Sequence, residues 1–269
     1  MDAAEVRLYV LDTAPLAARM GEARSVVAGR YRQASEVGPE RNRLEELGCG
    51  LLLRYVLGVR HDSDLAFGEF GKPRLARTRL ARTLLAKSWR AAGEGTATRA
   101  EAGRGDAAGT AASAESDAAG GVGPRLDDDA AGGIGLEFNL SNDVGLAVLA
   151  VSARPIGVDI ENVPATYTSP VELVARKYYS EEQRARIGDG SAYDQRVAWA
   201  QAWTRMEAIL KARGTGFSLD PRKHPEALDG WELWSCERDG CVITVAVDVP
   251  FEVELHEIGA DAALDALGP

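Results

Sequence analysis

The chain has 269 residues, of which 45% are apolar and 27% charged, with a formal net charge of −10 and an isoelectric point of about 5.0. This composition is typical of a globular protein with a sizeable core, organised as one large domain or two small ones. No run approaches the roughly 18 apolar residues of a membrane helix, and the start MDAAEVRLYV lacks the features of a signal peptide. We therefore expect a cytoplasmic protein without a membrane partner.

The charge is unevenly spread along the chain. Residues 16–90 carry fifteen lysines and arginines against eight acids, whereas residues 220–269 carry three against twelve. A basic amino-terminal third favours a polyanionic small molecule or an acidic protein partner, although a solvated surface is the alternative for any single arginine. No nucleic-acid-binding motif accompanies these charges, so no nucleic-acid partner is expected.

The three cysteines, Cys49, Cys236 and Cys241, are odd in number and scattered. This pattern fits a reducing compartment and argues against a disulfide framework. Cys236 and Cys241 flank a turn, but no second Cys/His pair lies at a suitable spacing, which disfavours a zinc site.

In chain order, residues 5–12 are predicted to form a strand and residues 39–57 a helix with its leucines on one face. Residues 91–133 contain fourteen Ala and ten Gly, with Val122 and Leu126 as the only large aliphatic residues. Such a segment cannot bury enough apolar surface to offset its ordering entropy. We expect a disordered insertion or surface loop with no catalytic role.

The rest of the chain alternates strands and helices. Strands are predicted at 135–141 and 145–153, separated by a turn at Asn142 and Asp143, and at 155–163. Helices are predicted at 168–178, 180–187 and 191–213, and further strands at 231–236, 241–249 and 251–258. Each half offers a strand-and-helix unit of similar size. The prediction is an α+β fold with two related subdomains, 1–152 and 153–269.

The stretch PIGVDIENV (155–163) places two acids within an apolar strand. Asp159 and Glu161 lie two residues apart, so their side chains project from the same face and repel each other unless a cation or basic partner lies between them. In the helix at 191–213, Trp203, Glu207 and Lys211 are spaced four apart and share one face.

Three carboxylates from these two segments would make a hard, all-oxygen site of the kind that Mg²⁺ uses when it also holds a phosphate. The absence of His and Cys nearby in the sequence disfavours softer metals. On spacing alone two alternatives stay open: a solvated acidic edge, and an exposed Glu–Lys pair on the helix surface.

The two segments together resemble a known family. GVDIE (157–161) followed by WTRMEAILKARGTGF (203–217) is similar to the paired signature of the 4′-phosphopantetheinyl transferases, specifically the larger two-subdomain type that activates peptide and polyketide synthases such as surfactin synthetase. EFGKPRL (69–75), FNLS (138–141) and KYYSEEQ (177–183) resemble further motifs of that family, in the same order along the chain.

The resemblance implies a reaction and an architecture. Phosphopantetheine would be moved from coenzyme A to a serine of an apo acyl or peptidyl carrier protein, in fatty-acid or secondary-metabolite biosynthesis, releasing 3′,5′-adenosine bisphosphate. Two similar α/β subdomains would be related by a pseudo-two-fold axis, with the active site at their interface. The family expectation is a monomer.

The resemblance also implies roles for the acids. Asp159, Glu161 and Glu207 would hold Mg²⁺ against the coenzyme A pyrophosphate, so that Asp159 contributes to cofactor binding as well. Glu207 would take the proton of the carrier serine, directly or through a metal-bound water. Lys211 would stabilise phosphate charge and steady Glu207.

Four more residues are implied in coenzyme A binding. Lys72, beside Pro73 in the Gly-Lys-Pro segment, would reach a coenzyme A phosphate. Ser141 and Asn142 would meet the region of the 3′-phosphate.

The chain departs from the family pattern at three places. Asn142 stands where the family usually has His, and Met206 stands where it has Lys. Counting back for an amino-terminal Arg leads to Glu45, whereas Arg41 and Arg43 lie upstream. The alternative is therefore a decayed, non-catalytic protein that binds coenzyme A or a carrier protein. An unrelated Mg²⁺-dependent phosphatase is a third possibility, but no nucleophilic Asp motif supports it.

Overall fold

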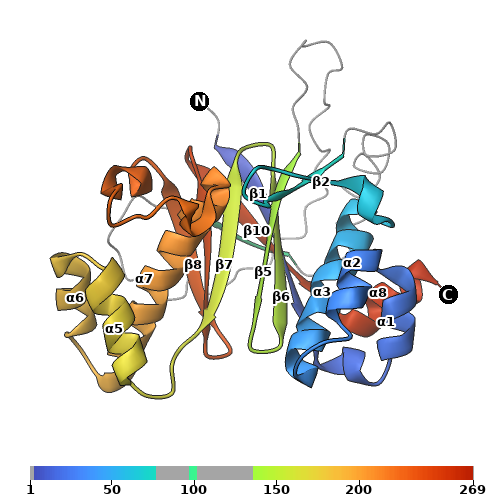
Figure 1. Ribbon diagram of the computed structural model, residues 1–269, viewed down its shortest axis with the longest axis horizontal. Helices are drawn as coiled ribbons and strands as arrows, with labels where there is room; N and C mark the ends of the chain where they lie inside the picture. Colours follow the sequence, from blue (N-terminus) through green and yellow to red (C-terminus); the bar gives the residue numbers. More distant parts are fainter. Residues whose placement is uncertain (1–2, 77–96, 102–135, 269) are drawn as a thin grey trace, which may run out of the picture.

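Two β-sheets form the centre of the computed structural model, which describes residues 3–76, 97–101 and 136–268. One sheet has five strands in the order β4-β10-β1-β6-β5, and the other has three in the order β7-β9-β8. A short hairpin, β2 (Leu65–Phe67) with β3 (Pro73–Leu75), stands apart from both. Helices lie on the two outer sides of the central sheets (Figure 1).

The five-stranded sheet joins the two ends of the chain. Its strands are β1 (Ala4–Asp12), β4 (Ala97–Glu101), β5 (Glu137–Asp143), β6 (Leu146–Ser152) and β10 (Phe251–Ile258). β1 pairs in parallel with β10 and antiparallel with β6. The last strand of the chain therefore completes the sheet that the first strand begins.

The three-stranded sheet is antiparallel and consists of β7 (Ile156–Asn162), β8 (Glu232–Arg238) and β9 (Cys241–Val247). Its apolar side chains pack against those of the other sheet in one buried cluster. That cluster includes Val6, Leu8 and Val10 of β1, Ile156, Val158 and Ile160 of β7, and Ile243, Val245 and Val247 of β9. Because strand side chains alternate, the intervening residues of β7 face the opposite way.

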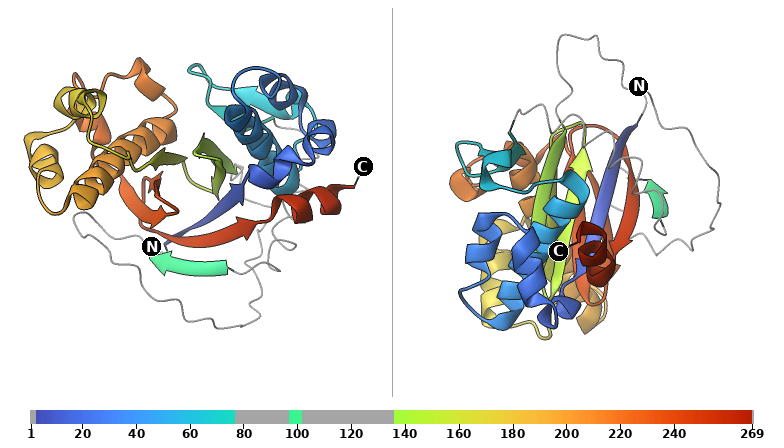
Figure 2. Two further views of the ribbon diagram at one scale, coloured as in Figure 1. Left: turned by 90° about the horizontal axis from the view of Figure 1, so that it is seen from below. Right: turned by 90° about the vertical axis from the view of Figure 1, so that its right-hand side faces the viewer.

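Helices cover the outer face of each sheet (Figure 2). The outer face of the five-stranded sheet packs against α1 (Met20–Val26), α2 (Gly29–Ala34), α3 (Glu40–Leu57) and α8 (Ala260–Leu267). The outer face of the three-stranded sheet packs against α7 (Ala192–Arg213), with α5 (Ser169–Tyr178) and α6 (Glu181–Ile187) beside it. In the described residues, none of the helices is long and apolar enough to cross a membrane.

Local signals in the sequence fix both ends of α7. Ser191 accepts a hydrogen bond from the backbone N–H of Asp194, whose carboxylate accepts one from the Ser191 N–H, so two unpaired donors at the helix start are satisfied. The helix ends at Gly214, which has a φ of 73°, a conformation that glycine adopts without steric cost.

Gly157 allows α7 to approach β7 closely. A Cβ atom added at Gly157 would lie 1.9 Å from the Ala208 carbonyl oxygen and 2.5 Å from the Ala212 nitrogen, both in the α7 backbone. The outward-facing residues of β7 are therefore Gly157, which contacts the helix, followed by Asp159 and Glu161, which lie beneath it.

The mixed α/β class and the main predicted strands and helices are confirmed. The turn predicted at Asn142 and Asp143 is wrong, because both residues belong to β5 and the chain reverses at Val144 and Gly145, which have positive φ values. Helices α1, α2 and α8 were not foreseen from the sequence.

Residues 97–101, which fall within the predicted insertion 91–133, form strand β4 and pair with β10. The prediction of a loop is wrong at these residues. An edge strand can be held by backbone hydrogen bonds alone, so no apolar pattern announces it. The rest of that segment lies outside the described residues. The boundary near residue 152 and the pseudo-two-fold relation stay predictions, and β10 and α8 join the sheet and helices of the amino-terminal half.

Substitution of Gly157 by Ala should destabilise the protein by roughly 1–3 kcal/mol or more, because the new methyl group collides with helix backbone that cannot rotate away. Urea unfolding monitored by circular dichroism measures the change. Gly21→Ala is the matched control, since nothing lies within 4 Å of an added Cβ on Gly21 in α1. Equal stability of both variants would contradict the close approach.

Candidate active site

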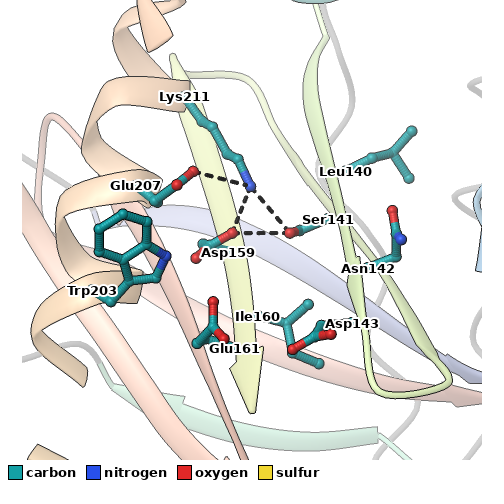
Figure 3. Close-up of a pocket in the computed structure, with 10 residues that line it drawn as sticks. All are labelled: Leu140, Ser141, Asn142, Asp143, Asp159, Ile160, Glu161, Trp203, Glu207 and Lys211. Atoms are coloured by element: carbon teal, nitrogen blue, oxygen red, sulfur yellow. Dashed lines mark hydrogen bonds and ion pairs between the residues drawn. The ribbon is translucent and has the colours of Figure 1, made fainter. Parts of the chain in front are cut away.

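A pocket of about 420 Å³ lies where β5 and β7, edge strands of the two sheets, meet beside α7 (Figure 3). Its lining residues are Leu140, Ser141, Asn142 and Asp143 of β5, Asp159, Ile160 and Glu161 of β7, and Trp203, Glu207 and Lys211 of α7. The pocket thus combines residues that are up to 71 positions apart in the sequence.

Side chains of β5 join the two sheet edges. The Asn139 Oδ1 accepts the backbone N–H of Val158 at 2.9 Å, and the Asp143 Oδ2 accepts that of Asn162 at 2.9 Å. These bonds satisfy backbone donors of β7 that face β5. They hold the two strands side by side without a shared ladder, which fixes the floor of the pocket.

The helix α7 supplies the other wall. Trp203, Glu207 and Lys211 all line the pocket, which confirms the prediction that they share one helical face. The Trp203 ring stacks on Trp199, with centroids 6.2 Å apart, and on Phe217, with centroids 5.9 Å apart. This aromatic packing restricts the movement of the helix face that carries Glu207.

The Lys211 ammonium connects the helix to both strands (Figure 3). Its Nζ donates to the Asp159 Oδ1 at 2.5 Å and to the Ser141 Oγ at 3.0 Å, and it lies 3.8 Å from the Glu207 Oε2. The Ser141 hydroxyl also donates to the Asp159 Oδ1 at 2.9 Å. The lysine is thus a basic partner for Asp159, one of the two paired acids of the strand.

Asp159 is the most buried acid of the pocket, with 4% of its surface exposed. Its Oδ1 has the partners just described, whereas its Oδ2 is buried and has no hydrogen-bond partner among the described residues. Burial raises the pKa of Asp159, and the Lys211 charge and hydrogen bonds oppose that rise. An unpaired buried carboxylate oxygen is costly, so a ligand cation or donor at Oδ2 would be strongly favoured.

The other two predicted metal-binding acids, Glu161 and Glu207, also have pKa values above their usual range. Burial raises the pKa of Glu161 to about 7, and the negative charges of Asp143 and Asp159 add to the rise. Burial also raises the pKa of Glu207, again with a contribution from Asp159. Repulsion between neighbouring carboxylates is the condition that an added cation relieves.

The chemistry of these oxygen donors fits a hard divalent cation such as Mg²⁺. In the part of the chain that the structure describes, however, no three His, Cys, Asp or Glu side chains already converge as a metal-binding group. Lys211 lies between Asp159 and Glu207. Asp159, Glu161 and Glu207 thus share one pocket without forming a preassembled ligand set, and the metal assignment stays a prediction.

Lys72 and Pro73 do not line this pocket. The Lys72 Nζ donates to the carbonyl oxygens of Ile156 and Ala212, each at 3.0 Å, and burial lowers the pKa of Lys72 to about 8. The side chain thereby fastens the β2–β3 hairpin to the start of β7 and the end of α7. Lys72 also lines a second pocket of about 320 Å³. Its predicted contact with a coenzyme A phosphate stays a prediction.

Sequence reasoning missed two acids at the site. Asp143 is a fourth carboxylate of the pocket, and Glu45 of α3 lies behind the pocket wall, hydrogen-bonded to Asn142 at 3.2 Å. The alternation along a strand could have identified Asp143, since it lies two residues beyond Ser141. Nothing in the local sequence pairs Glu45 with β5. Met206, the other departure from the family pattern, is buried with 4% of its surface exposed.

Comparison with known proteins addresses the part of the chain that carries β7 and α7. Residues 155–236 match the family model of the 4′-phosphopantetheinyl transferase superfamily. These residues belong to that superfamily. The resemblance found in the sequence motifs is thereby confirmed, and two curated relatives agree with it.

The first relative is the 4′-phosphopantetheinyl transferase HetI of Nostoc sp., which is 32% identical over 125 residues, covering 42% of this chain and 52% of HetI. The second is the 4′-phosphopantetheinyl transferase psf-1 of Bacillus pumilus, which is 30% identical over 82 residues, covering 30% of this chain and 33% of psf-1. The chain thus spans about half of the first relative and a third of the second.

The raised pKa of Glu161 predicts how stability depends on pH. The native state holds the Glu161 proton more tightly than the unfolded chain, so the stabilisation is complete below a pH of about 4.5 and is lost as the pH rises through about 7. Glu161→Gln removes this loss. The variant should gain up to about 3 kcal/mol relative to wild type between pH 4 and pH 8, because one pKa unit corresponds to about 1.4 kcal/mol.

Urea unfolding in EDTA at a series of pH values measures that difference. Glu182→Gln is the control, because Glu182 is an exposed acid of α6 paired with Arg186. A difference between Glu161→Gln and wild type that does not change with pH would show that Glu161 is not perturbed.

Proposed function

We propose that the protein transfers 4′-phosphopantetheine from coenzyme A to a serine hydroxyl of an apo acyl or peptidyl carrier protein, with Mg²⁺. The observation that supports this most directly is the meeting of Asp159, Glu161, Glu207 and Lys211 in one pocket, within the residues that match the superfamily. Both relatives are named as 4′-phosphopantetheinyl transferases, which favours the same activity.

The transfer requires a nucleophile and a leaving group at one phosphorus. The serine oxygen forms a bond to the phosphorus that carries pantetheine, and the bond from that phosphorus to the bridging oxygen of the pyrophosphate breaks. The leaving 3′,5′-adenosine bisphosphate keeps the electron pair. The serine proton must be removed as the new bond forms, so a base has to lie at the pocket.

Glu207 is suited to the role of base. Its carboxylate lines the pocket, and burial together with the Asp159 charge raises the pKa of Glu207, which increases its affinity for a proton. Lys211 is the cation that can stabilise negative charge on the phosphate groups. It is anchored for this role by Ser141 and Asp159.

The residues that would hold Mg²⁺ are Asp159, Glu161 and Glu207. Their fit rests on the unpaired Asp159 Oδ2 and on the pKa of Glu161, which burial raises and repulsion from the neighbouring carboxylates raises further. When bound, Mg²⁺ supplies neutralisation of the pyrophosphate charge and orientation of its oxygens. Lys211 would then exchange its contact with Asp159 for one with phosphate.

A second candidate function is binding of coenzyme A or a carrier protein without transfer. Two observations favour it: Met206 is apolar and buried where a lysine would add charge, and Asn142 is engaged by Glu45. Calorimetric binding of coenzyme A, with no mass gain on any carrier protein, is the outcome that would support this alternative.

The transferase is tested by incubating purified protein with Mg²⁺, coenzyme A and apo carrier proteins of fatty-acid and synthase types, and measuring the phosphopantetheine mass gain. Glu207→Gln and Asp159→Asn should each lower kcat/KM by at least about 100-fold, as expected for loss of a base or of charge stabilisation. Glu22→Gln, an exposed acid of α1 paired with Arg19, should keep full activity. Folded protein that modifies none of the carriers would refute the proposal.

Mg²⁺ should also stabilise the protein directly. At 100 times its Kd, the ion adds about 2.7 kcal/mol, which raises Tm by roughly 5–10 °C for a chain of this size. Differential scanning calorimetry with and without Mg²⁺ at pH 8 measures this, and Asp159→Asn should lose most of the gain. An equal rise in wild type and Asp159→Asn would contradict the predicted ligands.

A further inference from the structure

Glu45 is a buried carboxylate directly behind the pocket wall. It extends from α3 with 4% of its surface exposed. Its Oε1 accepts the backbone N–H of Gly145 at 2.7 Å, and its Oε2 accepts the Asn142 Nδ2 at 3.2 Å. Arg41 is its cationic neighbour, with Nε at 3.5 Å, but the Arg41 side chain is 61% exposed.

Asn142 connects Glu45 to the pocket. Its Nδ2 donates to Glu45, and its Oδ1 accepts a weak hydrogen bond from the Cys49 Sγ at 3.5 Å. Both partners belong to α3, so the amide is held against that helix while the residue still lines the pocket. The wall at this point is a neutral amide with a negative charge immediately behind it.

An anion and a hydroxyl group would interact differently with Asn142 and the carboxylate behind it. A phosphate placed against Asn142 would meet the negative charge of Glu45 across a single amide and that of Asp143 next to it. The exposed Arg41 is screened by water and salt and offsets only part of this repulsion. A hydroxyl carries no charge and can both accept the second Asn142 N–H and donate to a carboxylate.

The chemistry of the donor brings its ribose to this wall. Coenzyme A joins its pyrophosphate directly to the ribose that carries the 3′-phosphate. Asn142 follows Ser141, which contacts Lys211 and Asp159, and neighbouring strand residues are about 3.4 Å apart. The Ser141 side chain faces Lys211 and that of Asn142 faces α3, so a ribose that extends from a pyrophosphate at Lys211 across β5 would bring its 3′ substituent to Asn142.

We propose that the Glu45–Asn142 pair selects a nucleotide donor with a hydroxyl rather than a phosphate at this wall. The inference rests on the proposed function, and it means that dephospho-coenzyme A serves as phosphopantetheine donor at least as well as coenzyme A. Glu45 acts through Asn142 and is a specificity-determining residue.

The test compares kcat/KM for the two donors with Mg²⁺ and one apo carrier protein. In wild type, the ratio of dephospho-coenzyme A to coenzyme A should be 1 or greater. Glu45→Gln keeps the size and the acceptor for Gly145 but removes the charge, so the ratio should fall at least about fivefold. Arg41→Gln removes the partial counter-charge, so the ratio should rise.

Glu46→Gln is the matched control, because it makes the same charge change at the next residue of α3, on a half-buried acid whose carboxylate has no hydrogen bond to Asn142 among the described residues. Its donor ratio should equal that of wild type. If Glu45→Gln does not fold, the wild-type ratio and the Arg41→Gln shift decide. A wild-type ratio below about 0.1, or a ratio that Glu45→Gln and Arg41→Gln leave unchanged, overturns the inference.

A failure of the proposed function gives a different result, namely no transfer from either donor to any carrier protein. In that case the protein is titrated calorimetrically with adenosine 5′-monophosphate and with 3′,5′-adenosine bisphosphate, each in the presence of Mg²⁺. This measurement tests the inference alone. Equal or tighter binding of the monophosphate supports it. Tenfold tighter binding of the bisphosphate, or no binding of either nucleotide, overturns it.

Discussion

The close approach of α7 to β7 at Gly157 is the constraint on which the rest of the site depends. A helix normally lies at a distance set by the side chains beneath it, and here the absence of a Cβ lets the helix backbone nearly touch the strand. Asp159 and Glu161 follow Gly157 on the same face of the strand, so they lie beneath the helix face that carries Glu207 and Lys211. A single small residue thus converts an ordinary helix–sheet contact into a pocket of facing ionisable groups.

That geometry is electrostatically unfavourable, because it places several carboxylates close together. Four carboxylates line the pocket, and Lys211 is the cation that lines it with them. The lysine contacts Asp159 closely and Glu207 more distantly, while burial, together with repulsion from the neighbouring carboxylates, raises the pKa of Glu161 to about 7. Such a site is unfavourable for folding by itself and favourable for a ligand that brings positive charge, as expected where function and stability compete. Lys211 stabilises the pocket without that ligand and is also the group best placed to meet a phosphate.

The wall of the pocket opposite α7 is formed by β5. Side chains of β5 alternate between two tasks: Asn139, Ser141 and Asp143 reach β7, whereas Asn142 turns toward α3 and Glu45. The side of β5 that faces α7 is thereby hydrogen-bonded to β7. On the side that faces α3, the neutral amide of Asn142 lies in front of the Glu45 carboxylate. The departures from the family pattern at Asn142 and at the position of Glu45 are thus one structural feature, because the two side chains bind each other.

Much of this protein could be read from the chain itself. Alternation in β7, the four-residue spacing in α7 and the caps at Ser191 and Gly214 predict the elements and the faces that carry the acids, because these properties depend on neighbours within a few residues. Tertiary structure decided which faces meet. It brought Asp143 to the pocket and Glu45 behind the pocket wall, and it engaged Lys72 with the carbonyls of Ile156 and Ala212. It also paired the last strand with the first. The contacts of Glu45, Lys72 and β10 join residues 84 or more positions apart, and the contact of Asp143 with Asn162 joins two strands that share no ladder, so no local preference of the chain encodes them.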